Sequence, residues 1–227
     1  MKETEDLEAK VTEFQDNFGR VKKEIQKVIV GQEKVIESLL LCLLTDGHTL
    51  LEGLPGLGKT RLVITLSQVL DLSFKRIQFT PDLMPGDITG TEILVESSDG
   101  SREFQFQEGS IFAQVILADE INRATPRTQS ALLEAMQEHT VTVAGQSYKL
   151  QEPFFVAATQ NPLEMEGTYH LPEAQLDRFT FKLIVTFPQE SEMSEILRRT
   201  TGTTEPQVNK ILDAKKILEM RKIIRQV

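Results

Sequence analysis

The deciding stretch of this sequence is Gly53-Leu54-Pro55-Gly56-Leu57-Gly58-Lys59-Thr60. It matches the phosphate-binding pattern G-x-x-x-x-G-K-[ST] at every fixed position. Glycines allow the tight turn that points successive backbone N–H groups into one concavity, which suits phosphate oxygens. Lys59 supplies a positive charge for the β- and γ-phosphates, and the Thr60 hydroxyl is a suitable ligand for Mg²⁺. The stretch therefore predicts a nucleotide-binding loop.

The sequence on both sides of this loop supports the prediction. Residues 48–52 are a short apolar run of strand type, and residues 61–70 carry apolar side chains at helical spacing. A loop between a strand and a helix places the unpaired N–H groups and the positive dipole end of the helix beside the bound anion. The alternative, a glycine-rich hairpin with an exposed lysine, does not account for these flanking patterns.

Composition limits the classes of protein that remain. The 227 residues are enough for one large α/β domain, or for one domain and part of a second, and the 40% hydrophobic content is that of an ordinary globular protein. The formal net charge of −9 argues against general affinity for nucleic acid, because phosphate backbones are bound by basic surfaces. His48, His139 and His170 are scattered without metal-ligand spacing, so metal chemistry unrelated to ATP has little support.

The cellular compartment is predicted from cysteine usage and from the lack of targeting patterns. Cys42 is the only cysteine and lies in an apolar run, which fits a packed thiol in a reducing compartment. The start of the chain is charged and has no signal-peptide pattern, and no apolar run is long enough to span a bilayer. We expect a cytoplasmic protein that does not insert into a membrane.

Strands and helices alternate along most of the chain. An amphipathic helix is expected over residues 6–29, a break at Val30-Gly31-Gln32, and a second helix over residues 33–44. Further strands are expected at 74–79, 114–118, 154–158 and 181–185, with the plainest helix between them at 128–138. Near-continuous apolar strands separated by helices predict an open parallel sheet covered on both faces, with ligands at the carboxyl ends of the strands.

Two segments and the tail depart from this alternation. Residues 91–106, with a polar turn at 97–101, and residues 140–150 both have the pattern of a β-hairpin inserted into the sheet scaffold. Helices are expected at 192–200 and 205–226, joined by a polar turn at 201–204. We therefore predict an α/β core over residues 1–188 and the beginning of a helical unit over residues 189–227.

A pair of acidic residues follows the apolar strand that ends at Ala118. ATP hydrolysis needs a metal-binding acid and a group that positions the attacking water. We assign the first role to Asp119 and the second to Glu120. The alternative is that the two acids only cap the turn that follows. A complete phosphate loop upstream favours the catalytic interpretation, because the two motifs rarely coincide by chance.

A third polar strand end lies downstream. Residues 154–158 form an apolar strand, and Asn161 follows it, placed to hold the water or the γ-phosphate. Asn-Pro is also a common turn initiator, which is the alternative explanation. The order of loop, acids and polar strand end favours the functional role.

Longer stretches resemble a known family. With Val30-Gly31-Gln32, the phosphate loop, Asp119-Glu120 and Asn161, the chain resembles an AAA+ ATPase, and it is similar to the MoxR family in particular. The similarity extends over about residues 22–202. The stretches that carry it are FTPDLMPGDITG (79–90), ADEINRA (118–124), LLEAMQE (132–138), ATQNP (158–162), EGTY (166–169) and LPEAQLDRF (171–179).

The resemblance implies a P-loop NTPase (AAA+) core, two hairpin insertions that face the pore of a ring, and a C-terminal helical lid. It implies that Val30 and Gly31 line the adenine pocket, that residues 53–60 form Walker A, and that Arg61 joins them in binding the nucleotide. Catalysis would use Lys59, Glu120, Asn161 as sensor 1, and Arg178 as an arginine finger that reaches the ATP of a neighbouring subunit. Metal ligation would fall to Thr60 and Asp119. Arg123 and Arg127 are weaker candidates for contacts across the same interface.

The implied function is Mg²⁺-dependent ATP hydrolysis by a chaperone-like ring, a hexamer of identical subunits that remodels partners with a von Willebrand A-type domain. Family members continue into a full helical lid with a sensor 2 arginine, and this chain ends at Val227 within that lid, where no arginine matches a sensor 2 context. Two alternatives stay open: a nucleic-acid-coupled AAA+ motor, and a scaffold that binds ATP without hydrolysing it.

Overall fold

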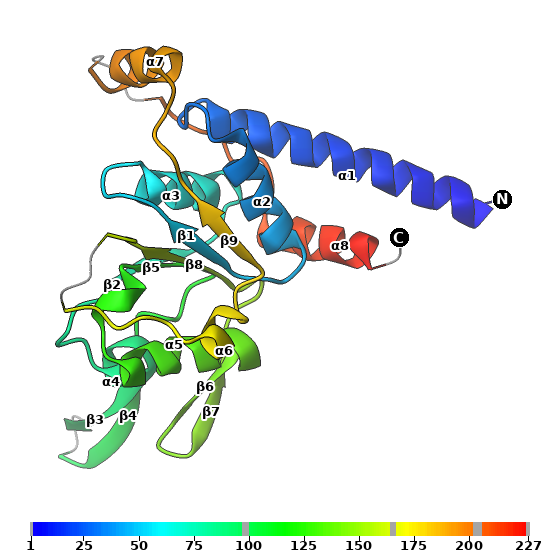
Figure 1. The fold of residues 1–227 in the computed structure, drawn as a ribbon. Coiled ribbons are helices and arrows are strands. Elements are labelled where there is room, and N and C mark those ends of the chain that lie inside the picture. The colour runs from blue at the N-terminus through cyan, green and yellow to red at the C-terminus, as the bar shows by residue number, and fades with distance from the viewer. Residues whose placement is uncertain (1, 97–99, 164–166, 202–205, 226–227) are drawn as a thin grey trace.

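A five-stranded parallel sheet forms the centre of the molecule (Figure 1). The computed structural model describes residues 2–96, 100–163, 167–201 and 206–225. The strand order is β2-β5-β8-β1-β9, and every pairing along it is parallel. The bounds are β1 Thr49–Glu52, β2 Phe74–Gln78, β5 Val115–Asp119, β8 Phe155–Gln160 and β9 Phe181–Ile184. The predicted α/β class and the positions of all five strands are confirmed.

Helices cover both faces of this sheet because its central strands are apolar on both sides. Side chains alternate between faces along β8, so Phe155 and Ala157 pack on one side and Val156 and Ala158 on the other. The first side is covered by α1 (Lys2–Gln26), α2 (Glu33–Leu44) and α3 (Lys59–Val69). The second side is covered by α4 (Pro85–Thr89) and α5 (Pro126–Glu138). Short helical turns occur at η1 (Ile121–Arg123) and α6 (Glu173–Leu176).

Both predicted hairpins are present and project from the same end of the molecule (Figure 1). One pairs β3 (Gly90–Glu96) with β4 (Arg102–Glu108), and the other pairs β6 (Thr140–Val143) with β7 (Gln146–Lys149). Residues 97–99 of the first predicted turn lie outside the described residues. The hairpins touch where the ring of Phe106 stacks on that of Tyr148, with 3.8 Å between the ring centroids.

The tail differs from its sequence-based description. The predicted helix over 205–226 is wrong in its first half: residues 206–213 have no helix, and α8 covers only Ala214–Ile224. Asp213 begins α8 as its N-cap, because its side chain accepts a hydrogen bond from the Lys216 backbone N–H at 2.8 Å. The segment before it is held to α3 instead, through Ile211 N–H and the Val69 carbonyl at 2.8 Å.

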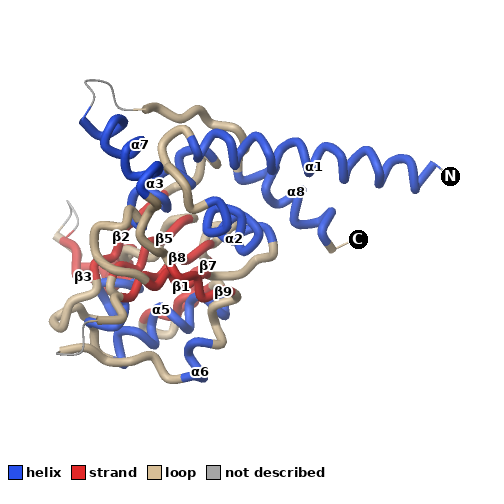
Figure 2. The backbone as a smooth tube through the Cα atoms, turned by 45° about the horizontal axis from the view of Figure 1, so that its top comes forward, coloured by secondary structure: helices blue, strands red, loops and turns tan. Residues whose placement is uncertain are grey.

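The last helix packs into the same core as α1, α2 and α3. Ile217 and Met220 of α8 are buried in that core, and Figure 2 shows α8 beside α1. Arg221 is also buried and ties α8 to the end of α2, donating to the Leu43 carbonyl from Nε (3.0 Å) and Nη2 (2.8 Å) and pairing with Asp46. The other tail helix, α7 (Glu190–Thr201), confirms the predicted helix at 192–200. The turn at 202–204 lies outside the described residues, and the assignment of residues 189–227 to a lid stays a prediction.

No helix in the described part of the chain is both long and apolar enough to cross a membrane.

A buried histidine joins three elements near the amino end of β1. His48 Nδ1 accepts a hydrogen bond from the Val156 backbone N–H of β8 at 3.1 Å, and Nε2 lies 3.0 Å from the Met136 carbonyl of α5. Its own carbonyl accepts from Thr180 N–H at 2.8 Å. Desolvation by burial lowers the pKa of His48 to about 4, although the hydrogen bond to Met136 opposes the shift. The ring is therefore neutral near pH 7, with Nε2 donating.

This buried ring predicts a loss of stability in mild acid. Below its ordinary pKa of about 6.5 the unfolded chain protonates His48, but the folded chain does not do so until pH falls to about 4. Since the unfolded state binds the extra proton, the free energy of unfolding falls as pH falls through this window, by about 3 kcal/mol in total.

Urea unfolding of wild type and His48→Gln at several pH values between about 7 and about 4.5 measures this contribution. We expect the variant to be less stable at neutral pH and to lose less stability on acidification. His170→Gln, at an exposed histidine, should retain the wild-type pH dependence. Equal slopes for wild type and His48→Gln would contradict the prediction.

Candidate nucleotide site

The phosphate loop joins β1 to α3 and opens onto a hollow of about 370 Å³. Gly56 (φ 82°) and Gly58 (φ 79°) have left-handed backbone conformations, which residues with a Cβ adopt only at a cost. Gly53 is required for a different reason: a Cβ there would lie 2.6 Å from the Val185 carbonyl oxygen. Residues 55–61 line one wall of the hollow, and the opposite wall consists of Asp119, Glu120, Thr159, Gln160 and Asn161.

Lys59 begins α3 with its ammonium group directed back onto the loop. Its Nζ donates to the carbonyls of Gly53 (2.5 Å) and Leu54 (3.0 Å). Burial lowers the pKa of Lys59, and the carboxylates of Asp119 and Glu120 partly oppose this shift. The two carbonyls hold the ammonium at the mouth of the loop, where phosphate oxygens are stronger acceptors for it.

Asp119 ends β5 with both carboxylate oxygens engaged. Oδ1 accepts from the Thr159 hydroxyl at 2.5 Å. Oδ2 accepts from Arg76 twice, from Nε at 3.0 Å and from Nη2 at 2.7 Å. Thr159 lies in the stretch ATQNP (158–162), but the sequence assigned it no role, and Arg76 lies in none of the quoted motifs. Arg76 lies on the edge strand β2, and Gln78 of the same strand is in register with Asp119. A charged residue near the carboxyl end of a strand next to β5 is therefore the sequence signal that could have identified Arg76 as a partner of Asp119.

Glu120 follows in a strained conformation, because its φ of 57° lies in the left-handed region, which costs a side-chain-bearing residue about 1–2 kcal/mol. Its backbone N–H donates to the Thr159 hydroxyl at 2.9 Å. Its Oε2 accepts from Gln78 Nε2 (2.8 Å) and from Arg123 Nη1 (2.9 Å). The Thr159 hydroxyl thus holds both acids at once, donating to Asp119 and accepting from Glu120. Arg123, expected at a subunit interface, pairs here with Glu120 of its own chain.

Asn161 follows the end of β8 on the same wall and is buried. Its Oδ1 accepts from the Leu163 backbone N–H at 3.1 Å, which fixes the orientation of the amide. In the part of the chain that the structure describes, no hydrogen bond involves Nδ2. This N–H₂ group is a donor suited to a phosphate oxygen or a water. The structure thus brings the loop, both acids and Asn161 together, as expected from the parallel sheet.

Arg178 lies at the other end of the strands. It precedes β9, whose first residue Phe181 pairs in parallel with Thr49, whereas the phosphate loop follows the last residue of β1. The side chain is exposed and borders a separate hollow of about 680 Å³ that also contains His48 and His139. Arg178 therefore cannot serve the loop of its own chain, and its role as a finger for a neighbour stays a prediction.

The expected adenine residues lie beside the loop and do not line its hollow. Gly31 (φ 66°) is covered by α7, since a Cβ there would lie 2.3 Å from Glu192 Oε1. Gln32 Nε2 donates to the Leu57 carbonyl at 3.2 Å, which ties this segment to the loop. The adenine role of Val30 and Gly31 stays a prediction.

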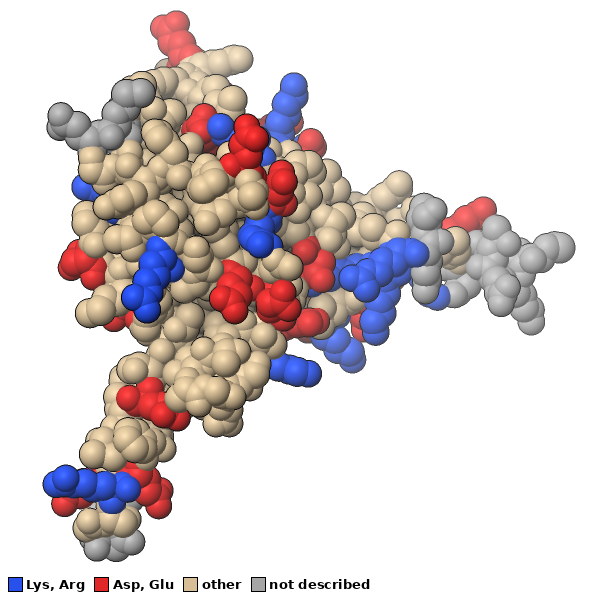
Figure 3. All heavy atoms as spheres, turned by 60° about the horizontal axis from the view of Figure 1, so that its bottom comes forward, with Lys and Arg blue, Asp and Glu red and all other residues tan. Residues whose placement is uncertain are grey.

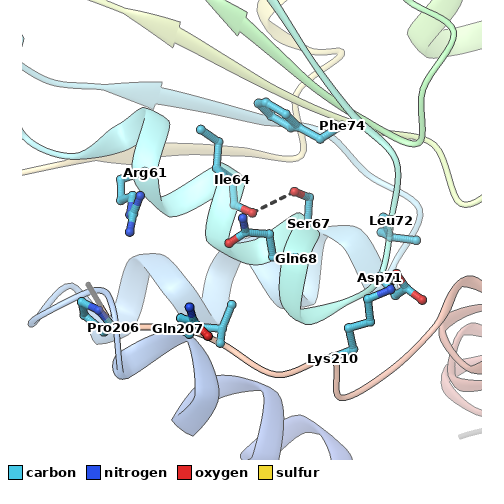
Figure 4. Close-up of a pocket in the computed structure, with 11 residues that line it drawn as sticks. Arg61, Ile64, Ser67, Gln68, Asp71, Leu72, Phe74, Pro206, Gln207 and Lys210 are labelled. Atoms are coloured by element: carbon cyan, nitrogen blue, oxygen red, sulfur yellow. Dashed lines mark hydrogen bonds and ion pairs between the residues drawn. The ribbon is translucent and has the colours of Figure 1, made fainter. Parts of the chain in front are cut away.

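Arg61 borders the phosphate hollow and a second one of about 590 Å³. Figure 4 shows this second hollow between α3 and residues 206–210, with Arg61, Gln68 and Lys210 around it. Lys210 is paired with Asp71 at 2.5 Å. Asp119 and Glu120 line the phosphate hollow and not this one, so we do not assign the chemistry to it.

Charges of both signs are interspersed over the face drawn in Figure 3, with no continuous basic surface. This agrees with the acidic net charge and gives no support to a nucleic-acid-binding face there.

Comparison with known proteins agrees with this geometry. Residues 48–181 match the family model described as "ATPase family associated with various cellular activities (AAA)". The chain is 48% identical over 200 residues to "Chaperone MoxR1" of Mycobacterium tuberculosis, which covers 88% of this chain and 52% of the relative. It is 32% identical over 189 residues to "Protein MoxR" of Methylorubrum extorquens, covering 81% of this chain and 54% of the relative.

A protein of Cytophaga hutchinsonii with a solved crystal structure superposes with a TM-score of 0.89 at 44% identity, covering 100% of this chain and 68% of the other. The chain spans about half the length of the curated relatives it matches. The family model covers more than half of the chain. The chain belongs to the MoxR family of AAA ATPases.

Proposed function

We propose that this chain binds and hydrolyses ATP with Mg²⁺ at the hollow between the phosphate loop and the ends of β5 and β8. The family implies ATP binding and ATPase activity; the assignment of roles to residues is the proposal. One observation carries it: residues 55–61, Asp119, Glu120 and Asn161, far apart in the sequence, line a single hollow.

The residues present fit a magnesium ion. Thr60 and Asp119 offer a hydroxyl and a carboxylate, the hard oxygen ligands that Mg²⁺ prefers. Among the described residues, no group of three or more His, Cys, Asp or Glu side chains is placed to hold a metal. That suits Mg²⁺, which keeps several waters and is shared with phosphate oxygens instead of being caged by protein. When bound, it would neutralise charge on the β- and γ-phosphates.

Four other side chains would bind the phosphates, position the attacking water and hold the two acids in place. Lys59 would exchange the carbonyls of Gly53 and Leu54 for phosphate oxygens. Glu120 would orient the attacking water and accept its proton, and Asn161 Nδ2 would hold the water or the γ-phosphate. The hydroxyl of Thr159 would keep Asp119 and Glu120 in fixed relation during this step.

We further propose that the ATPase acts as a ring, a hexamer of identical subunits, in which Arg178 of one subunit completes the site of the next. The exposed position of Arg178 at the opposite end of the strands from its own loop supports this. Such an arginine stabilises charge in the transition state and makes hydrolysis depend on assembly. The name of the M. tuberculosis relative supports a chaperone-like role, which we extend to remodelling of partners with a von Willebrand A-type domain.

Two other functions would each give a distinct experimental result. A nucleic-acid-coupled motor would show salt-dependent binding of DNA or RNA together with stimulated turnover. A nucleotide-dependent scaffold would bind ATP without releasing phosphate at concentrations where it self-associates.

Two substitutions test the site. Lys59→Ala should weaken nucleotide binding by roughly 10- to 100-fold, because it removes charge-assisted hydrogen bonds to phosphate. Glu120→Gln should leave binding nearly unchanged and lower phosphate release by about 10²- to 10⁴-fold, since it removes the base. Glu134→Gln, at an exposed position of α5, is the control. Undiminished turnover in both site variants would refute the assignment.

Mixing two inactive variants tests the arginine finger. Arg178→Ala should bind nucleotide normally but hydrolyse it about 10³- to 10⁵-fold more slowly. When it is mixed with Lys59→Ala, rings will contain sites with an intact loop from the first variant and an intact finger from the second. We expect partial recovery of phosphate release on mixing. If Arg178→Ala alone keeps wild-type turnover, the finger is not Arg178.

The shared hydroxyl of Thr159 gives a further prediction. Thr159→Val keeps the shape of the side chain but leaves Asp119 Oδ1 and Glu120 N–H without this partner, so the free energy of unfolding should fall by about 1–3 kcal/mol. Turnover should fall with it, because both acids lose their common support. Thr159→Ser keeps the hydroxyl and should retain most of both properties. Denaturant unfolding and phosphate release measure the two effects.

A further inference from the structure

Arg76, on the edge strand β2, is bound to Asp119, the carboxylate that we propose as a metal ligand. Arg76 donates twice to Asp119 Oδ2, from Nε at 3.0 Å and Nη2 at 2.7 Å, while Thr159 takes Oδ1 at 2.5 Å. Both oxygens of the carboxylate therefore have protein partners, and its charge is balanced by a cation of the same chain. A carboxylate in this condition is a weaker ligand for a second cation.

The two sides of this ion pair differ in their freedom to move. The side chain of Asp119 is 11% exposed and is held by Thr159, whereas that of Arg76 is 49% exposed and lies on the edge strand β2. When the pair separates, it is therefore the guanidinium that swings away. A long, half-exposed arginine loses little solvation in doing so.

A second partner is in place for the displaced arginine. Arg76 Nη2 lies 2.6 Å from Gln78 Oε1, two residues further along the same face of β2. Gln78 in turn donates to Glu120 Oε2 at 2.8 Å. The guanidinium can leave Asp119 and still keep a hydrogen bond and contact with water.

We propose that Arg76 is a stand-in cation at the metal position, which Mg²⁺ must displace from Asp119 when the nucleotide is loaded. The inference rests on the proposed function. Arg76 keeps the charge of the buried carboxylate balanced in the nucleotide-free chain and raises the magnesium concentration needed for tight nucleotide binding. It does so without taking part in the reaction, so it regulates loading and is not a catalytic residue.

The matched substitutions are Arg76→Gln and Lys75→Gln. Both remove one positive charge from β2, but Lys75 donates to the Gly109 carbonyl at 3.2 Å and has no contact with either acid. ADP binding is measured by calorimetry over a titration of free Mg²⁺. We expect Arg76→Gln to reach half-saturation at roughly tenfold less Mg²⁺ than wild type, the size of one charge-assisted hydrogen bond. Lys75→Gln should behave as wild type.

An unchanged or higher magnesium requirement in Arg76→Gln would overturn the inference and leave Arg76 as a structural support of Asp119. Arg76→Lys guards against a variant that fails to fold, because it keeps the charge while losing the paired donors from Nε and Nη2. Its magnesium requirement should lie between those of wild type and Arg76→Gln, and a requirement above that of wild type would count against the proposal.

Thermal unfolding with Mg²⁺ alone separates this inference from the proposed function. Mg²⁺ without nucleotide should raise the Tm of Arg76→Gln more than that of wild type or Lys75→Gln, because only that variant has an uncompensated Asp119. Equal shifts in all three proteins would overturn the inference. If wild type binds no nucleotide even at saturating Mg²⁺, the proposed function fails, and this measurement still decides the role of Arg76.

Discussion

The parallel register of β5, β8 and β1 is the constraint on which the rest of the structure depends. Ala118 pairs with Ala158, and Ala158 pairs with Leu50, so the carboxyl ends of the three strands are level with one another. Asp119 is the last residue of β5, and Glu120, Asn161 and the phosphate loop each come directly after one of these strand ends. A shift of one residue would turn every side chain of a strand to the opposite face and separate these groups. Both faces of these strands are packed against helices, so such a shift would break the fit of the buried side chains on both sides of the sheet.

Charge compensation is the second feature of the site. The carboxylates of Asp119 and Glu120 are each paired with a cation of their own chain, Arg76 and Arg123 respectively. Lys59, whose pKa is lowered by burial, is held by carbonyl oxygens. A partly buried group of acids and bases is stable only when such partners are present. In the proposed function, a nucleotide bound in this hollow would replace existing partners of these side chains, because each charged group already has one.

Long segments with a regular period were predictable from the sequence, and irregular ones were not. The five sheet strands were predicted from short apolar runs, and both hairpins from strand-like segments that flank polar turns, because these patterns depend on local backbone conformation. The helix predicted over residues 206–213 does not form, because the backbone of Ile211 is hydrogen-bonded to Val69 of α3. The N-cap of α8 is Asp213, so the helix begins only after this segment. Tertiary contacts here override the helical character of the sequence.

The sequence by itself determined the phosphate loop, the acid pair and Asn161, because each lies in a short motif whose chemistry depends on neighbouring residues. Only the tertiary structure decided that Thr159 holds both acids, that Arg76 covers Asp119, and that Arg178 lies away from its own loop. These partners are separated by 40 residues for Thr159 and Asp119 and by 43 for Arg76 and Asp119. Contacts of that kind arise from the order in which strands pair, which no local pattern encodes.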